Sequence, residues 1–161
     1  MLVIGYGNPG RLDDALGPAL AAAIEAAGLA GVSVESDYQL TVEDACLLAE
    51  HDVVIFADAD VAAAPPFYFE RIVGDPARTG FSSHSVSPQA LLSLAEDLFG
   101  AAPRAFVLGI RGYEFDEFGE RLSDGARANL AAAAEFLKER LETGDYTEIP
   151  RGHFAAREEA P

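Results

Sequence analysis

The sequence contains one cysteine, no tryptophan and few basic side chains. The lone Cys46 cannot form an internal disulfide, and the first residues, MLVIG, lack the basic and long apolar segments of a secretory signal. We therefore expect a reducing, cytoplasmic location. Only 11 Lys and Arg accompany 27 Asp and Glu, which gives a formal net charge of −16. That charge repels nucleic acid and anionic membranes, so neither is an expected partner.

Half of the 161 residues are hydrophobic, which is enough to bury one core. The longest apolar stretch, residues 15–32, carries Glu25 and has helical periodicity, so it predicts a buried amphipathic helix rather than a membrane span. Residues 145–161 lose apolar periodicity and predict a flexible C-terminal tail. We expect a single domain over residues 1–144 in a monomeric protein.

Segments of strand character alternate with segments of helical character along this domain. The expected strands are residues 1–7, 32–40, 52–60, 67–73 and 104–112. The expected helices are residues 13–28, 42–51, 87–100 and 122–144. The segment 67–73 follows a proline break and predicts an edge or antiparallel strand. The alternation predicts an α/β fold, a three-layer αβα sandwich with a mostly parallel, twisted sheet.

The loop GYGNPGRLDD, residues 5–14, fits the G-x-G-x-x-G pattern of dinucleotide sites, and Asp37 lies where a ribose-binding acid could lie. The three glycines are Gly5, Gly7 and Gly10. A pyrophosphate needs free backbone N–H groups and a positive helix end. Pro9 removes one donor, and Asp13 and Asp14 add negative charge. The loop therefore disfavours nucleotide binding.

A second interpretation of the same loop comes from Asn8 to Gly10. The sequence GNPG after an apolar strand resembles the opening of peptidyl-tRNA hydrolases, whose loop continues toward a catalytic histidine. Here the continuation is RLDDALG, which has no histidine. A tRNA-binding enzyme also needs a cationic surface, so this class stays the less favoured alternative.

The third interpretation is a cation site, because carboxylates follow two of the expected strands. In doubly wound sheets, ligands bind beyond the carboxyl ends of the strands. Asp13 and Asp14 follow the first strand, Asp58 and Asp60 end the run VVIFADAD, and the loop with His84 can reach the same side. Two carboxylates and one imidazole suit zinc, nickel or iron and leave positions open for water or a substrate donor.

Structural roles compete with function at several of these positions. Asp13 is expected only to cap or complement a helix start, whereas a charge such as Asp58 at the end of an apolar run is costly unless it is paired or metal-bound. Cys46 falls on an apolar stripe and predicts core packing. His51 and His153 are expected to be a helix-dipole partner and a tail residue. Ser82 and Ser83 beside His84 suggest a serine hydrolase, but the G-x-S-x-G elbow is missing.

Three motifs together resemble the signatures of the hydrogenase maturation endopeptidases, which remove the C-terminal extension from the nickel-iron hydrogenase large subunit. The motifs are GYGNPGRLDDALGP, VVIFADAD and SSHSVSPQALLSLA. The resemblance covers about residues 1–140 and implies a phosphorylase/hydrolase-like sandwich. The first signature of the family reads G-x-G-N, a spacer, two acids and a glycine. Gly5, Gly7, Asn8, Asp13, Asp14 and Gly17 occupy it here.

The resemblance also implies which residues act. The second acid of the first motif, the aspartate ending the middle strand and the histidine of the third motif carry over to Asp14, Asp58 and His84 as metal ligands and catalytic residues. Two departures from the family pattern occur. Asp14 stands where Glu is commoner, and the segment 61–73 lacks an expected glycine. The shorter side chain keeps the hard oxygen donor.

The implied cofactor is nickel that arrives already inserted in the substrate, a hydrogenase large-subunit precursor, while the free protein could hold an adventitious ion such as zinc or cadmium. The metal would polarise a carbonyl or a water, with one carboxylate accepting a proton. The family is often classed as aspartic-type, yet no D-[ST]-G pair occurs here. Processing would activate the hydrogenase. A non-catalytic nickel- or zinc-binding assembly factor is the alternative.

Overall fold

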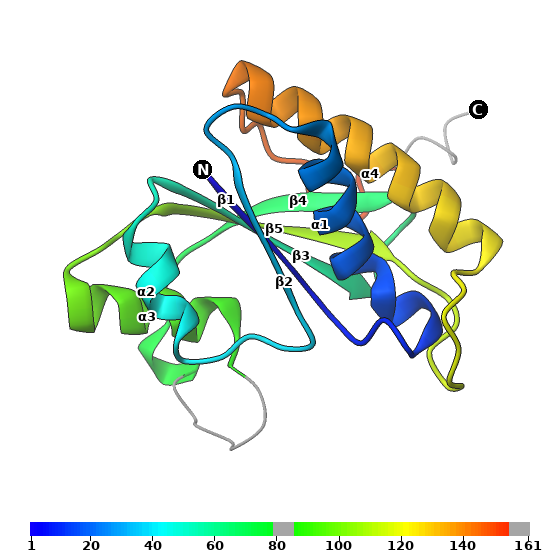
Figure 1. The fold of residues 1–161 in the computed structure, drawn as a ribbon, viewed down its shortest axis with the longest axis horizontal. Coiled ribbons are helices and arrows are strands. Elements are labelled where there is room, and N and C mark those ends of the chain that lie inside the picture. Colours follow the sequence, from blue (N-terminus) through cyan, green and yellow to red (C-terminus); the bar gives the residue numbers. More distant parts are fainter. Residues whose placement is uncertain (79–85, 155–161) are drawn as a thin grey trace.

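Five strands form one sheet in the order β2-β1-β3-β5-β4 (Figure 1). The computed structural model describes residues 1–78 and 86–154. The parallel strands are β1 (Leu2–Tyr6), β2 (Ser33–Asp37), β3 (Val53–Asp60) and β5 (Arg104–Arg111). The edge strand β4 (Phe67–Ile72) runs antiparallel to β5, as its sequence predicts.

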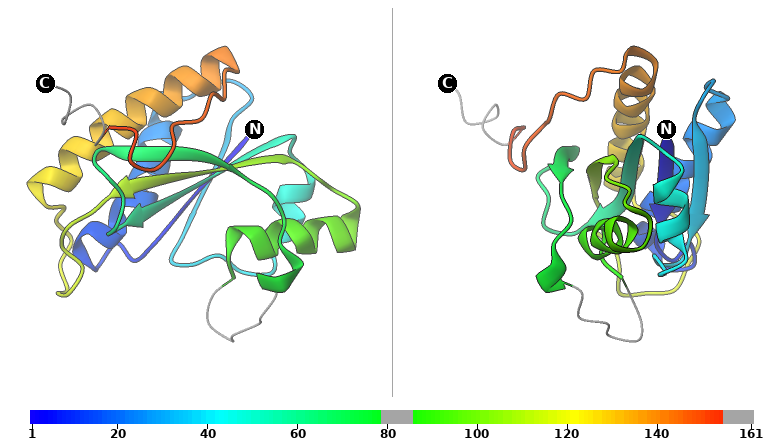
Figure 2. Two further views of the ribbon diagram at one scale, coloured as in Figure 1. Left: turned by 180° about the vertical axis from the view of Figure 1, so that it is seen from behind. Right: turned by 90° about the vertical axis from the view of Figure 1, so that its left-hand side faces the viewer.

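Two pairs of helices cover the two faces of the sheet (Figures 1 and 2). One face carries α1 (Leu16–Ala27) and α4 (Asp124–Thr143), and the other carries α2 (Asp44–Ala49) and α3 (Pro88–Phe99). Single 3-10 turns, η1 (Leu12–Ala15) and η2 (Pro76–Arg78), precede α1 and follow β4. The predicted three-layer αβα sandwich is confirmed. None of the described helices is long and apolar enough to cross a membrane.

Alternation along β3 assigns its side chains to the two layers. Ile55 and Ala57 belong to the core beneath α1 and α4, whereas Val54 and Phe56 belong to the core beneath α2 and α3. All four are completely buried, which explains why the run reads as continuously apolar. By the same alternation, Asp58 lies on the side of α2 and α3.

Close backbone contact between α1 and the sheet depends on two glycines. A Cβ atom on Gly17 would lie 2.3 Å from the Tyr6 carbonyl oxygen and 2.5 Å from that of Ala57. A Cβ on Gly5 would lie 2.1 Å from the Gly17 oxygen. Because only glycine allows this approach, α1 lies directly on β1 and β3.

The segment after α4 differs from the expected tail. The main chains of Phe69 and Ile149 exchange two hydrogen bonds of 2.8 and 2.7 Å, so residues 145–154 lie along the outer edge of β4. The Tyr146 ring stacks on Phe106 with 5.3 Å between centroids. For residues 145–154 this packing replaces the expectation of a flexible tail, because pairing through the main chain needs no apolar periodicity. Residues 155–161 lie outside the described part.

Two smaller expectations also change. Cys46 is exposed, because α2 buries Ala45 and Leu48 and turns the neighbouring position to solvent. The predicted helix 13–28 starts inside the 3-10 turn η1, which begins at Leu12 with a φ of 51°, and becomes α-helical only at Leu16. The first residues of the range 13–28 instead form hydrogen bonds with the loop after β5.

Replacing Gly17 by Ala should lower the free energy of unfolding by about 3 kcal/mol or more, because the new methyl group overlaps two backbone oxygens that cannot rotate away. Urea denaturation measures the change. Ala22→Ser, on the exposed side of the same helix, is the control and should cost less than about 0.7 kcal/mol. Equal stabilities of the Gly17→Ala variant and the wild type would contradict the close contact.

Candidate functional site

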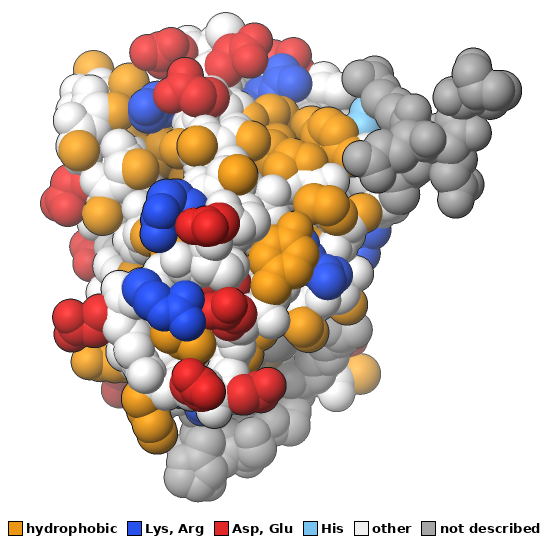
Figure 3. Space-filling model, turned by 90° about the vertical axis from the view of Figure 1, so that its right-hand side faces the viewer, with side chains coloured by type: hydrophobic (Ala, Val, Ile, Leu, Met, Phe, Trp, Pro, Cys, Tyr) orange, Lys and Arg blue, Asp and Glu red, His pale blue; other side chains and the backbone are white. Residues whose placement is uncertain are grey.

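The loops that follow β1, β3 and β5 meet at the carboxyl end of the parallel sheet, on the right in Figure 1. Figure 3 shows this end of the molecule, where acidic, basic and hydrophobic side chains lie side by side. Asp13, Asp14, Asp58 and Asp60 all belong to these loops and strand ends. The region is therefore the one in which the sequence predicted a site.

Asp13 is completely buried and serves the structure. Its carboxylate accepts hydrogen bonds from the backbone N–H groups of Tyr113 (2.8 Å), Glu114 (3.0 Å) and Ser123 (2.8 Å) and from the Ser123 hydroxyl (2.7 Å). Burial alone would raise the pKa of Asp13, but these hydrogen bonds outweigh it and hold the pKa below its usual value. The Ser123 hydroxyl also caps α4 by accepting from Ala126.

Asp14 lies at the turn that follows β1. The Asn8 N–H donates to Asp14 Oδ2 at 2.9 Å, so the loop folds back over this carboxylate. Gly7 makes the fold possible, because its φ is 144° and a Cβ there would lie 2.0 Å from the Asp14 carbonyl oxygen. The side chain is partly buried. Asp14 is thus held in place beside the end of β1.

The same loop leaves little room for a phosphate. The Gly7 N–H donates to the Asp37 carbonyl (3.1 Å), the Gly10 N–H to Asn8 Oδ1 (2.8 Å) and the Arg11 N–H to the Asn8 carbonyl (3.1 Å). The donors that would cradle a pyrophosphate are therefore used inside the protein. Despite its glycine pattern, the loop does not have the form of a dinucleotide site.

Among the carboxyl groups of this region, that of Asp58 has the pKa shifted furthest from its usual value. Burial raises its pKa to about 7, and the nearby charges of Asp14 and Asp60 add to the rise. Hydrogen bonds from the Ala59 N–H, at 2.8 Å, and from the Tyr6 hydroxyl act in the opposite direction. Asp14 and Asp58 are thus close enough to influence each other, although they are 44 positions apart in the numbering.

Asp58 lines a cavity of about 260 Å³. Tyr6, Tyr68 and Arg151 form part of its wall, and the start of α3, at Pro88 and Gln89, forms another part. The segment that leads into α3 contains His84, which lies outside the described residues together with Ser82 and Ser83. The described structure therefore places the beginning of α3, but not His84, beside Asp58.

Asp60 is engaged in the protein itself. Oδ1 accepts from the Ala62 and Ala63 N–H groups at 2.8 and 3.1 Å, and Oδ2 pairs with Arg151 at 2.7 Å. Burial would raise the pKa of Asp60, but the hydrogen bonds and the guanidinium together lower it. Asp60 was a candidate ligand by its place in the sequence, and the structure assigns it to this ion pair.

In residues 1–78 and 86–154, no three His, Cys, Asp or Glu side chains converge as a metal site. What these residues provide is two carboxylates, Asp14 and Asp58, whose charges influence each other. Sequence reasoning missed the aromatic and basic neighbours of Asp58. Tyr6 could have been found, since it ends the first strand next to a glycine loop, but nothing in the sequence pattern indicated Arg151.

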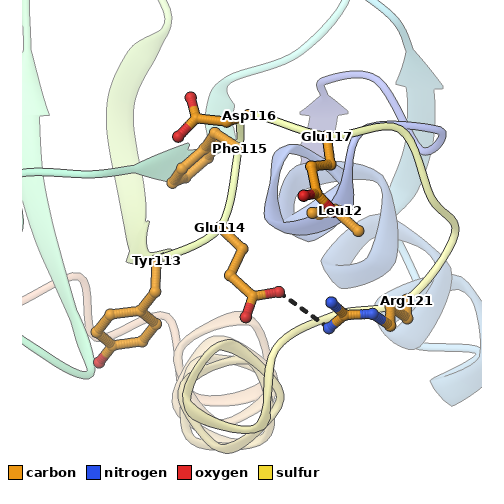
Figure 4. A pocket seen from close by; sticks show the side chains of 7 residues that line it. All are labelled: Leu12, Tyr113, Glu114, Phe115, Asp116, Glu117 and Arg121. Atoms are coloured by element: carbon orange, nitrogen blue, oxygen red, sulfur yellow. Dashed lines mark hydrogen bonds and ion pairs between the residues drawn. The ribbon is translucent and has the colours of Figure 1, made fainter.

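A second hollow, of about 300 Å³, lies in the segment between β5 and α4 (Figure 4). Its lining comprises Leu12, Tyr113, Glu114, Phe115, Asp116, Glu117 and Arg121. Glu114 and Arg121 point toward one another and form an ion pair of 2.9 Å. The hollow contains none of the predicted ligands. This segment contacts the region of the predicted site through its backbone, which donates hydrogen bonds to the Asp13 carboxylate.

Several solved structures with the same architecture are named as hydrogenase maturation peptidases. The chain is similar to the hydrogenase 2 maturation peptidase from Thaumarchaeota archaeon SCGC_AB-539-E09, at 24% identity and a TM-score of 0.65, over 88% of this chain and 97% of that one. It is also similar to the maturating endopeptidase HybD from E. coli, at 24% identity and a TM-score of 0.62, over 94% and 97% of the two chains.

A third similar structure is the [NiFe] hydrogenase maturation protease HycI from Thermococcus kodakarensis KOD1, at 21% identity, with a TM-score of 0.65 and coverage of 88% of this chain and 92% of that one. No protein-family model and no curated protein matches the sequence. The chain therefore has the fold of the hydrogenase maturation peptidases, which confirms the fold implied by the resemblance.

Replacing Asp13 by Asn should lower the free energy of unfolding at pH 7 by about 2–4 kcal/mol, because an amide group would face N–H donors. The lowered pKa means that the ionised carboxylate stabilises the fold above the unfolded pKa of about 3.9 and loses that effect as the pH falls through the folded pKa. Urea denaturation at pH 7 and pH 3 should show the difference shrinking. Asp124→Asn, exposed in the first turn of α4, is the control, and equal losses in both variants would refute the role.

In metal-free protein, Asp58→Asn should raise the free energy of unfolding, whereas Asp13→Asn should lower it. The wild type keeps its full stability below the unfolded pKa of about 3.9 and loses part of it as the pH rises toward the folded pKa of about 7. The variant should therefore match the wild type near pH 4 and exceed it by about 2–4 kcal/mol at pH 8. Chemical denaturation with a chelator present tests this. Asp52→Asn, exposed just before β3, serves as the control. A pH-independent difference would contradict the buried state of Asp58.

Proposed function

We propose that this protein is an endopeptidase that removes the C-terminal extension of a nickel-loaded [NiFe] hydrogenase large-subunit precursor. The observation that carries the proposal is the pair Asp14 and Asp58 at the carboxyl edge of a fold shared with named hydrogenase maturation proteases. We place the protein in the cytoplasm and expect it to act as a monomer.

The nickel belongs to the substrate in this proposal. Two carboxylates at one sheet edge repel each other, and a divalent cation between them relieves that repulsion. Asp14 and Asp58 would bind the precursor's nickel, with His84 as the third ligand. Because the metal joins both proteins, it would hold the scissile peptide beside the cavity that Asp58 lines. Only a precursor that has received nickel would then be cut.

The residues near the metal suit hydrolysis. As a Lewis acid, the substrate's nickel would polarise the scissile carbonyl or a water molecule. One of the two carboxylates would accept the proton of the attacking water. This assignment gives the enzyme an aspartic-type character in which processing activates the hydrogenase.

The test is the intact mass of a large-subunit precursor incubated with about one molecule of this protein per hundred. We expect a nickel-loaded precursor to lose one C-terminal peptide in many turnovers, and a precursor from which nickel is withheld to keep its mass. A stable complex with an unchanged precursor mass would contradict the proposal and favour the non-catalytic assembly factor.

Substitution of His84 by Ala should reduce the processing rate at least about 100-fold while leaving the melting temperature unchanged. His153→Ala, an exposed histidine after α4, is the matched control and should process at the wild-type rate. Mass spectrometry over a time course gives both rates. Wild-type processing by the His84 variant would remove His84 from the site.

A further inference from the structure

Arg151 lines the same cavity as Asp58, although it comes from the segment after α4. Its guanidinium lies 3.9 Å from the centre of the Tyr68 ring, and Nη1 lies 2.7 Å from Asp60 Oδ2. Nη2 donates a hydrogen bond to the Tyr68 hydroxyl. The backbone N–H of Arg151 donates to Glu70 Oε1 at 2.9 Å. A guanidinium that is stacked, paired and anchored in this way has one orientation.

Charge sets Arg151 apart from the rest of the cavity. Among the described lining residues it is the one cation, next to the carboxylates Asp58, Asp60 and Glu70. A guanidinium carries five N–H groups; in the described part of the chain Asp60 and Tyr68 accept side-chain hydrogen bonds from it, and Nε lies 3.9 Å from Glu70 Oε2 as a longer ion pair. The Arg151 side chain is 52% exposed. It therefore keeps donors for a ligand.

A peptide in this cavity needs such donors. Its carbonyl oxygens lose water on entry, and an unpaired oxygen next to carboxylates is unfavourable. The Tyr6 hydroxyl is engaged with Asp58, and the Tyr68 hydroxyl with Arg151 and Asp60. The lining also includes the side-chain amide of Gln89, but Arg151 is the one donor among the described lining residues that carries a positive charge.

We propose that Arg151 is a substrate-contacting residue whose guanidinium donates hydrogen bonds to an oxygen acceptor of the bound peptide, a main-chain carbonyl or a carboxylate, beside Asp58. This inference rests on the peptidase function proposed above. It gives Arg151, the described residue of the segment 145–154 that lines the cavity, a part in binding. The segment pairs with β4 and so brings Arg151 to the cavity.

The test compares KM and kcat for precursor processing in the wild type, Arg151→Ala and Glu148→Ala. Glu148 is the matched control, because Oε1 accepts from the Arg71 N–H at 2.7 Å and holds the same segment without lining the cavity. We expect Arg151→Ala to raise KM about tenfold with kcat changed less than about twofold, and Glu148→Ala to leave both unchanged. If Arg151→Ala does not fold, Arg151→Gln replaces it.

Salt distinguishes the two kinds of acceptor. If the acceptor is a carboxylate, the KM difference between wild type and Arg151→Ala should shrink as ionic strength rises, and if it is a carbonyl the difference should persist. An unchanged KM in Arg151→Ala would overturn the proposal. A rise of equal size in Glu148→Ala would also overturn it, since Arg151 would then only fasten the segment.

A wild type that leaves the precursor intact contradicts the peptidase function but still allows a decision on Arg151. In that case the dissociation constant of the nickel-loaded precursor is measured for the wild type and Arg151→Ala. Binding about tenfold weaker in the variant supports the contact, and equal binding overturns it.

Discussion

The buried carboxylate of Asp13 is the interaction on which the site depends most. It joins the turn after β1 to the segment after β5 and to the first turn of α4, through backbone donors on Tyr113, Glu114 and Ser123. An ionised group can be buried only when its lone pairs are satisfied, so the three segments must come together as one unit. The position of Asp14, the next residue, follows from that arrangement. Asp13 therefore supports the site without belonging to the cavity.

At the end of β3, the buried carboxylate of Asp58 receives fewer hydrogen bonds than that of Asp13. Asp58 follows five fully or nearly buried apolar residues, Val53–Ala57, and receives too few hydrogen bonds to offset its burial, so its pKa rises to about 7. Asp60, two residues later on the same strand, is satisfied by Arg151 and by two backbone N–H groups. The contrast separates a structural acid from one that gains by binding a cation. That gain, with Asp14 nearby, is the physical basis of the proposed recognition of a nickel-loaded substrate.

Periodicity in the sequence was sufficient to predict the order and type of the strands and helices, because burial of each element is decided locally by its own side chains. It also led to four aspartates, Asp13, Asp14, Asp58 and Asp60, since residues at the carboxyl ends of parallel strands share one sheet edge, and the family resemblance singled out Asp14 and Asp58 among them. It could not find Arg151 or the ordered segment 145–154, because their contacts with Tyr68 and Phe69 are long-range and leave no local pattern. The prediction that Cys46 packs in the core was wrong, because the six-residue helix α2 buries a narrower stripe than expected. The ligand role of His84 stays a prediction.

We propose that Asp14, Asp58 and His84 form one metal-recognition site. A crystal structure of the protein soaked with nickel or cadmium tests it most directly. We expect one ion bound by carboxylate oxygens of Asp14 and Asp58 and by a ring nitrogen of His84, next to the cavity lined by Tyr6 and Arg151. An ion bound elsewhere while Asp14 and Asp58 stay without metal, or a His84 side chain directed away from them in the metal-bound protein, would contradict it.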